Sequence, residues 1–312
     1  MKMRLAIFAL CPLIFALHAA ATSAETTVKS LDGVRGAIKT QDARQMFDSG
    51  MSGIKRPGAF STKLPAGFTS AYLMQQLAPG QDPKRVVLSS AEPWPLRQNS
   101  FVAMVCLAAS PDEAARSMQY DSGSCHSLVG GDSDKKDVWF GVFEVTGGGV
   151  PKLVARTDTP VTTPTNWSDT DIDLPEDLEA RDAKDDALSM PASWTRFDLA
   201  PYQIKSGEYA FGVRAGWSEG YAGGGADFEA LYLFRIEGKS LRVVFAQPMT
   251  FDKMIAGDWH KDGTRSHDVS DASNSLVILP SETNGFHDIQ LRQQTGKWRR
   301  TFKWSADTQS YE

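Results

Sequence analysis

Strand-like runs separated by glycine turns occupy the chain from residue 93 to its end, and this pattern limits the protein to a mostly β fold. Short glycine turns join neighbouring antiparallel strands, so we expect antiparallel meander or sandwich units. Short helices are predicted near the amino terminus, over 40–47 and 69–77. The predicted strands span 101–108, 138–145, 152–156, 208–214, 228–236, 241–246, 276–279, 287–292 and 300–304.

The first six predicted strands form two groups that align with each other without a gap. Pro93, Trp94, Leu96, Arg97, Phe101 and Val105 fall on Pro201, Tyr202, Ile204, Lys205, Tyr209 and Val213. In each group a later strand is followed by a glycine turn, at Gly147 and at Gly238. A tandem duplication explains this match. Two unrelated meanders aligned by eye give the same picture, so both interpretations stay open.

Composition divides the chain into five parts. We expect a signal peptide over 1–24, a polar lead-in over 25–60, a first β-rich unit over 61–160 and a second over 195–312. Between the units, 161–194 is rich in Asp, Glu and Pro and shows little periodicity, which is typical of an acidic linker or a surface excursion.

The amino terminus has the features of a cleaved export signal. Lys2 and Arg4 precede an apolar run over 5–17, and small residues before Glu25 suit a signal peptidase. The run is about 13 residues long, against the ~20 that a membrane-spanning helix needs. We therefore expect a periplasmic or secreted protein. An uncleaved anchor is the alternative, and a lipid anchor on Cys11 is disfavoured because Leu10 is not small.

The charge balance of the mature chain is acidic. Lys2 and Arg4 leave with the signal peptide, so 31 of the 33 basic residues remain against 38 acidic ones, a net charge of −7. This balance argues against nucleic acid and anionic membranes as partners. No later segment reaches membrane-spanning length, so we expect a soluble chain without a membrane span.

Two cysteines, Cys106 and Cys125, remain after cleavage. An even cysteine count in an exported chain predicts one disulfide, here Cys106–Cys125. The alternative is a reactive thiol, which requires a reducing compartment or an unpaired partner.

The pentapeptide 216–220 matches the G-x-S-x-G pattern of serine hydrolases, with Ser218 as the nucleophile. That motif works at a sharp strand-to-helix turn. Here three glycines follow closely, at 223–225, and they disfavour a helix. We therefore expect Ser218 to lie on a hairpin without a catalytic role. In the alternative, Ser218 is the nucleophile and His287, His260 or His267 is the base.

The segment 257–268 resembles part of a calcium loop, with Asp258, His260, Asp262 and a glycine at 263. A histidine nitrogen at the third position and Val269 in place of a bidentate glutamate depart from that pattern. Zinc or manganese, held by Asp258, His260, His267 and Asp268, is the other metal hypothesis. Asp258, His260, Asp262 and Asp268 are thus the candidate metal ligands, for calcium or zinc, and no cofactor is assured. A solvated hairpin loop is the alternative.

Three aromatic residues lie in or beside glycine-rich segments: Trp217, Tyr221 and Trp259. Such residues anchor binding interfaces because they bury a large area at little conformational cost. The same residues can instead pin a loop to its own domain, and the sequence does not choose between these roles.

Together these features predict an exported, non-catalytic binding protein that engages a protein or a cell-envelope glycan, with an inhibitor or immunity-type protector as one form. The alternative function is a periplasmic hydrolase that uses Ser218 or a metal in the 257–268 loop. A passive structural protein of the envelope is the third hypothesis.

Overall fold

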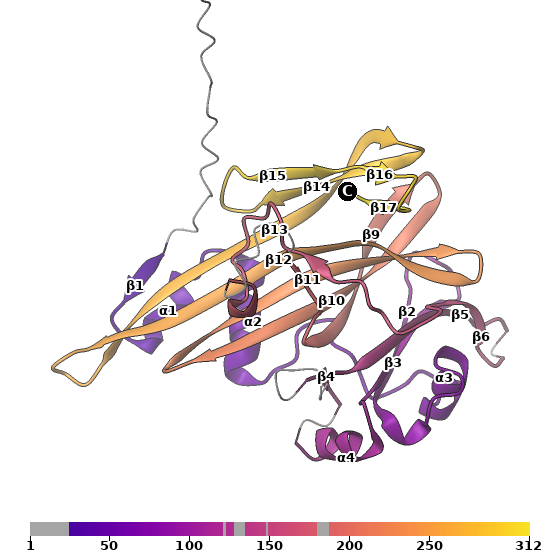
Figure 1. Cartoon of the computed structure of the whole chain (residues 1–312), viewed down its shortest axis with the longest axis horizontal. Helices are drawn as coiled ribbons and strands as arrows, with labels where there is room; N and C mark the ends of the chain where they lie inside the picture. The colour runs from indigo at the N-terminus through magenta and orange to yellow at the C-terminus, as the bar shows by residue number, and fades with distance from the viewer. Residues whose placement is uncertain (1–24, 121–122, 128–134, 148, 180–186) are drawn as a thin grey trace, which may run out of the picture.

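The computed structural model describes residues 25–120, 123–127, 135–147, 149–179 and 187–312 (Figure 1). The predicted signal peptide, 1–24, lies outside the described residues. The fold is mostly β, as the strand pattern predicted, with 50% of residues in strands. In the described part of the chain, no helix combines the length and the apolar character needed to cross a membrane.

Nine strands form one nearly closed, barrel-like sheet, in the order β2-β3-β5-β6-β12-β11-β10-β9-β4. Their bounds are β2 (Val86–Pro93), β3 (Ser100–Leu107), β4 (Cys125–His126), β5 (Asp137–Glu144), β6 (Lys152–Arg156), β9 (Ser193–Lys205), β10 (Glu208–Tyr221), β11 (Gly224–Glu237) and β12 (Ser240–Trp259). The two terminal strands of this order, β2 and β4, leave an open side that we call the seam.

The two predicted strand groups are both antiparallel within themselves, but they do not form separate units. A parallel pair between β6 and β12, at Arg156 and Ser240, joins them into a single mixed sheet. Two independent sandwiches are therefore absent from the described residues. This arrangement does not show a duplication, which stays a prediction.

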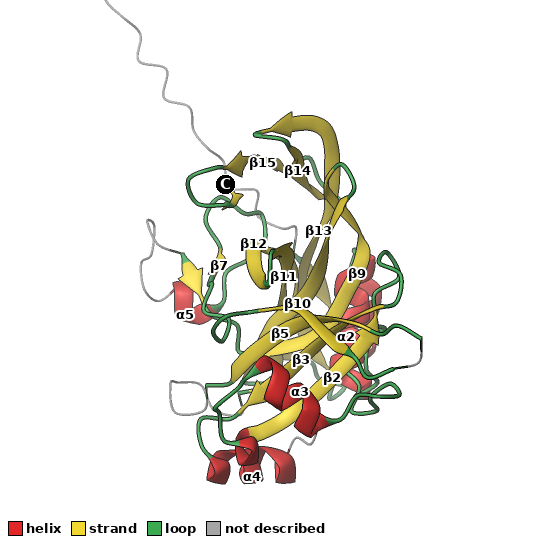
Figure 2. Cartoon of the chain, turned by 90° about the vertical axis from the view of Figure 1, so that its right-hand side faces the viewer, coloured by secondary structure: helices red, strands yellow, loops and turns green. Residues whose placement is uncertain are grey.

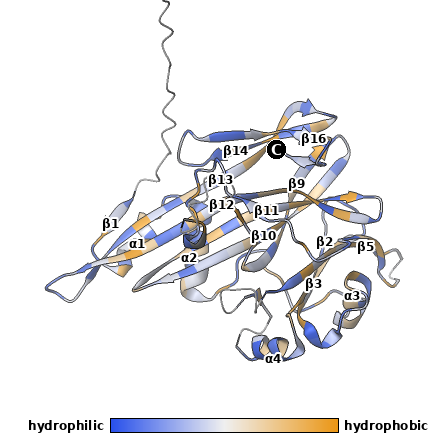
Figure 3. Cartoon of the chain, in the orientation of Figure 1, coloured by the Kyte–Doolittle hydropathy of each residue, from blue (hydrophilic) through white to orange (hydrophobic). Residues whose placement is uncertain are grey.

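Alternation along the strands gives the sheet an apolar inner face. Val213, Ala215 and Trp217 of β10 point to the main core, where Phe140 and Tyr232 are fully buried. Figure 3 shows hydrophobic and hydrophilic residues alternating along the long strands. The intervening outer positions carry polar or charged side chains, except where a helix or the carboxy-terminal strands cover apolar ones.

Three further layers cover the outside of the sheet (Figures 1 and 2). Helix α3 packs on β2, β3 and β5. The carboxy-terminal strands cover apolar residues of β9 to β12, while α1 and α2 lie against β12 and β13. The bounds are α1 (Leu31–Ala37), α2 (Gln41–Ser52), α3 (Ser70–Leu77), η1 (Pro83–Arg85), α4 (Pro111–Tyr120), α5 (Glu176–Glu179), β1 (Thr26–Val28), β7 (Thr165–Asn166), β8 (Leu188–Ser189), β13 (Arg265–Thr283), β14 (Phe286–Gln293), β15 (Arg299–Phe302), β16 (Trp304–Ser305) and β17 (Ser310–Tyr311).

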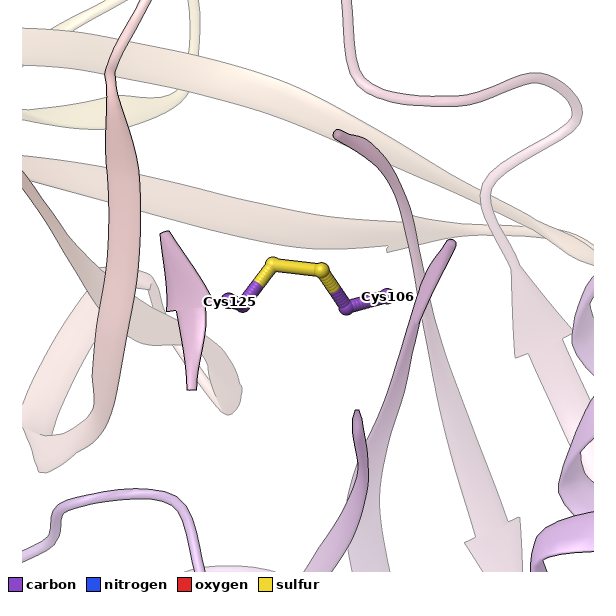
Figure 4. The surroundings of a disulfide bond; sticks show 2 residues. All are labelled: Cys106 and Cys125. Carbon is purple, nitrogen blue, oxygen red and sulfur yellow. A yellow bond between two sulfur atoms is a disulfide. The ribbon is translucent and has the colours of Figure 1, made fainter. Parts of the chain in front are cut away.

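The predicted disulfide between Cys106 and Cys125 is present, with the Cα atoms 5.9 Å apart (Figure 4). Cys106 lies on β3 beside one edge of the sheet, and Cys125 lies on β4 at the other edge. The bond therefore links the two ends of the strand order across the seam. A disulfide is typical of an oxidising compartment outside the cytoplasm.

The segment that the sequence suggested to be an acidic linker or surface excursion contributes to the core. Trp167, Ile172 and Leu178 are buried in the main apolar cluster. Asp171 is also buried, and its Oδ1 accepts a hydrogen bond of 2.8 Å from Asn274 Nδ2. The apolar residues of 161–194 therefore attach this segment to the sheet. Residues 180–186 lie outside the described part of the chain.

Candidate functional site

A short segment after α2, residues 56–61, occupies the seam and connects its two sides, and we call it the seam segment. Phe60 N donates to Thr195 O at 3.1 Å, and Phe197 N donates to Gly58 O at 3.1 Å, so the segment pairs with β9. On the other side, Ser61 N donates to Ser90 Oγ of β2 at 3.1 Å. Gly58 has φ +76°, and a Cβ there would lie 2.8 Å from Phe197 O, so this close approach requires glycine.

A pocket of ≈ 340 Å³, which we call the seam pocket, opens between this segment, α2, β4 and the ends of β9, β10 and β11. Its apolar wall includes Phe60, Trp194, Trp217 and Phe228, all of which belong to the main core. Its charged or titratable lining consists of Lys55, Arg56, His126, Arg196, Asp227 and Glu229. An apolar cavity with a few converging polar groups is the usual form of a small-molecule site.

Glu229 is the centre of a buried charge network at the pocket wall. Its carboxylate lies 2.6 Å from Arg56 Nη1, 3.0 Å from Arg196 Nη2 and 3.4 Å from Arg214 Nη1. Arg214 also pairs with Asp198 at 2.7 Å. Arg56 comes from the seam segment and the other groups from the sheet, so the network fastens that segment to β9, β10 and β11.

The network changes the pKa values of its acids. Burial by itself raises the pKa of Glu229, but Arg196, Arg214 and Arg56 together outweigh it and hold the pKa below its usual range. The pKa of Asp198 is lowered in the same way, with Arg214 and Arg196 overcoming the effect of burial. Both acids are therefore held in the charged form that the arginines need.

A row of polar side chains crosses four strands beside this network. Ser218 of β10 is paired with Asp227 of β11, Asp227 with Asp252 of β12, and Asp252 with Asp271 of β13. Cross-strand partners place their Cβ atoms ~5 Å apart on the same face. The row therefore concentrates three carboxyl groups beside α2, where a Cβ on Gly50 would lie 3.6 Å from Asp227 Oδ2.

The carboxyl groups of this row have unequal environments. Burial, followed by the neighbouring Asp227 and Asp271 charges, raises the pKa of Asp252 well above its usual value. Burial also raises the pKa of Asp227, although the Ser218 hydroxyl and the His126 charge oppose the shift. Asp271 accepts hydrogen bonds from Lys39 N, Thr40 N and Thr40 Oγ1 at 2.8–2.9 Å, which fixes the start of α2.

The structure places Ser218 on a regular hairpin, where the sequence analysis expected it. Strand β10 continues to Tyr221 and turns directly into β11, so no helix follows Gly220. The Ser218 side chain hydrogen-bonds to Asp227. His287 lies on β14, paired with Glu282 of β13. Glu282 is eleven residues beyond Asp271 on β13, ~35 Å along an extended strand, so His287 and Ser218 are not brought together.

The candidate metal ligands lie around the β12–β13 hairpin. Asp262 Oδ1 accepts hydrogen bonds from Thr264 N at 3.0 Å and Thr264 Oγ1 at 2.7 Å, while Asp268 accepts one from Thr27. Within the described ranges, no three His, Cys, Asp or Glu side chains form a group that could hold a metal. Asp258, His260, Asp262 and Asp268 are therefore not assembled into a metal site here.

The three aromatic residues that were candidates for binding have different environments. Trp217 is buried, and its Nε1 donates to Ser189 Oγ at 3.1 Å and Met190 O at 3.0 Å, so it pins a neighbouring loop. Tyr221 is half-buried and donates to Glu219 Oε2 at 2.6 Å. Trp259 is 70% exposed near the end of β12. Of the three, only Trp217 lines the seam pocket.

The sequence does not indicate most residues of the seam pocket. Arg56, His126 and Glu229 come from three distant segments and match no motif. One signal was available, because Asp227 and Glu229 interrupt an otherwise apolar strand and Asp252 does the same in the next strand. A charged residue inside a predicted strand core indicates a buried partner or a site.

Comparison of the chain with protein-family models, with curated proteins and with solved structures gives no match. The function is therefore inferred from the site itself.

Proposed function

We propose that the mature chain is an exported binding protein that takes a small cell-envelope ligand, or the end of a larger one, into the seam pocket. One observation carries the proposal: a pocket of ≈ 340 Å³ whose aromatic wall is continuous with the core and whose rim is charged. Ligand sites typically enclose ~300–1,000 Å³ and combine these two features.

The construction of the pocket supports a binding role. Its walls are fixed by the disulfide at Cys125, by the Glu229 network and by the hydrogen bonds of the seam segment. Rigid walls reduce the ordering cost of binding. Gly50 of α2 also lines the pocket, and a side chain at this position would point toward Asp227 and narrow the opening.

Retention of a ligand from its natural extract tests the proposal. The mature protein is expressed in a bacterial periplasm, purified at physiological salt and examined by native mass spectrometry. We expect a bound small molecule on the parent protein and its loss in Gly50→Leu. Gly36→Leu is the matched control, because Gly36 also lies in a helix and a Cβ there meets nothing within 4 Å. An empty parent protein, or equal occupancy in Gly50→Leu, would remove the proposal.

A hydrolase that uses Ser218 is the second candidate, and the hydrogen bond between Ser218 and Asp227 at the pocket favours it. In this scheme Asp227 accepts the hydroxyl proton as Ser218 attacks a carbonyl carbon. Release of nitrophenolate from nitrophenyl acetate by the parent protein supports hydrolysis if it is lost in Ser218→Ala while ligand retention is unchanged. Attack on the ester carbonyl leaves the acetyl group on Ser218 and breaks the bond to nitrophenolate, and water then removes the acetyl group as acetate. Equal rates for the two proteins exclude it.

A further inference from the structure

The charged lining of the seam pocket has an excess of cations. Lys55, Arg56 and Arg196 supply three positive charges, against Asp227 and Glu229. The whole chain, in contrast, has a formal net charge of −5. A locally cationic cavity in an acidic protein attracts anions selectively, because the field inside a low-dielectric cleft is focused by its walls.

The Glu229 network does not neutralise its own arginines. Arg56, Arg196 and Arg214 share the carboxylates of Glu229 and Asp198, so three cations face two anions. Arg196 Nε is buried and has no hydrogen-bond partner among the described residues. A buried donor without an acceptor is costly, so Arg196, which lines the pocket, keeps hydrogen-bonding capacity that Glu229 does not use.

Lys55 provides a second cationic contact at the pocket rim. Its Nζ donates a hydrogen bond to the carbonyl oxygen of Gly123 at 3.4 Å. No carboxylate in the described segments lies within the 4.0 Å of an ion pair with this Nζ. The ammonium group is therefore available to a ligand, and its flexible stem allows it to follow a headgroup.

The acid beside these cations is already engaged. Asp227 accepts a hydrogen bond from Ser218 and interacts with the charge of His126. Its negative charge is therefore partly satisfied within the protein, and it opposes an incoming anion less than a free carboxylate would.

The remaining wall is apolar. Phe60, Trp194 and Phe228 are buried at 3%, 5% and 2% exposure, yet all three line the cavity. The pocket surface that water can reach is mostly apolar, so an acidic group alone would leave apolar surface in contact with water. The pocket thus matches a molecule that has both an acidic head and an apolar body.

We propose that the seam pocket binds a single-chain amphipathic anion, with its acidic headgroup held by Lys55 and Arg196 and its apolar body against Phe60, Trp194 and Phe228. This inference rests on the proposed binding function and names the ligand class of the same pocket. A free fatty acid or aromatic acid has this chemistry, and so does the headgroup region of an anionic lipid. The free acid is the source that a cavity of ≈ 340 Å³ favours, because it is the smaller of the two molecules.

Two dyes that share one aromatic framework test the inference. Anilinonaphthalene sulfonate carries the acidic group, and its parent phenylnaphthylamine is uncharged. We expect the sulfonate to bind the folded protein at least tenfold more tightly, and dodecanoate to displace it better than dodecanol does. Raising the salt concentration from about 50 mM to about 500 mM should lower the affinity for the sulfonate and leave the affinity for phenylnaphthylamine unchanged. Equal affinities for the two dyes would overturn the inference that the ligand is an anion, but the proposed binding function would stand. Binding of neither dye would overturn the proposed binding function as well.

Charge variants distinguish dye binding in the pocket from dye binding elsewhere on the protein. Lys55→Gln should lower the affinity for the sulfonate about three- to tenfold and leave phenylnaphthylamine unchanged. Lys152→Gln is the matched control, because Lys152 is exposed on β6 and does not line the pocket. Unchanged sulfonate affinity in Lys55→Gln, with Arg196→Gln also unchanged and folded, contradicts the assignment.

Vesicles distinguish the two sources of the acid. Phosphatidylglycerol vesicles are sedimented with the protein, and free dodecanoate is measured in parallel. We expect dodecanoate to bind and the vesicles to leave the protein in solution. Co-sedimentation without dodecanoate binding overturns the assignment of a free single-chain anion.

Discussion

Asp227 on β11 and Asp252 on β12 are direct cross-strand partners, so two carboxyl groups face each other beside helix α2. Asp252 is 6% exposed, and its Oδ1 has no hydrogen-bond partner among the described residues. Two opposed carboxylates in a buried site cannot both ionise at low cost. The pair therefore favours a shared proton, and it makes the stability of the protein sensitive to pH.

Asp252→Asn should stabilise the protein at neutral pH. The folded-state pKa of Asp252 is raised, so this residue contributes stability below its unfolded-state pKa and loses it as pH rises through the folded-state pKa. An asparagine stays neutral and can donate to Asp227. We expect a gain of about 1–3 kcal/mol at pH 7 that shrinks toward pH 4. Urea unfolding of both proteins across this range measures it, and a constant difference would contradict the cause.

Glu229→Gln should be strongly destabilising, because it leaves Arg56, Arg196 and Arg214 without their shared carboxylate. Breaking a buried ion pair from one side costs about 3–5 kcal/mol. Glu144→Gln is the control: the side chains of Glu144 and its partner Arg97 are 42% and 36% exposed, so its loss should cost at most about 1 kcal/mol. Chemical denaturation compares them, and similar losses would show that the network is not the anchor of the seam.

Removal of the disulfide should weaken the seam. The loop between Cys106 and Cys125 spans 19 residues, and its closure contributes about 3 kcal/mol in the loop-entropy model. The double variant Cys106→Ser and Cys125→Ser should lose that amount. Hydrogen exchange should show β4 and the seam segment opening more often than β11. In the parent protein a reductant should reproduce the loss, and in the double variant it should have no effect.

Gly50→Ala should stabilise the protein, because a helix-interior glycine costs up to about 1 kcal/mol and a Cβ at Gly50 meets only Asp227 Oδ2, at 3.6 Å. Gly58→Ala should have the opposite sign, since its φ is +76° and its Cβ would meet Phe197 O at 2.8 Å. Thermal unfolding of the two variants checks these signs. Destabilisation by Gly50→Ala would mean that α2 is held more tightly over the pocket than the structure shows.

Local patterns predicted much of the secondary structure. Strands β3, β5 and β6 and helix α3 were placed within one residue of their observed bounds, because alternation and glycine turns are short-range signals. Other elements were missed or shortened. Strand β2 and helix α4 were not predicted, and β12 was predicted to end at 246 although it runs to Trp259. Pro248 of β12 pairs with β11, and residues 250–254 pair with both β11 and β13. This pairing keeps them in a strand that local preference does not favour.

The sequence by itself determined that the chain is mostly β, that Cys106 and Cys125 pair, and that Ser218 lies on a hairpin. The mostly β fold and the hairpin follow from residues that lie close together in the chain. The disulfide follows from the presence of two cysteines after the predicted signal peptide. Tertiary structure alone decided that β6 joins β12 in parallel, that the disulfide crosses a seam, and that Arg56, Arg196 and Arg214 meet at Glu229. Those contacts join residues far apart in the chain, and their energy depends on burial, which no local pattern records.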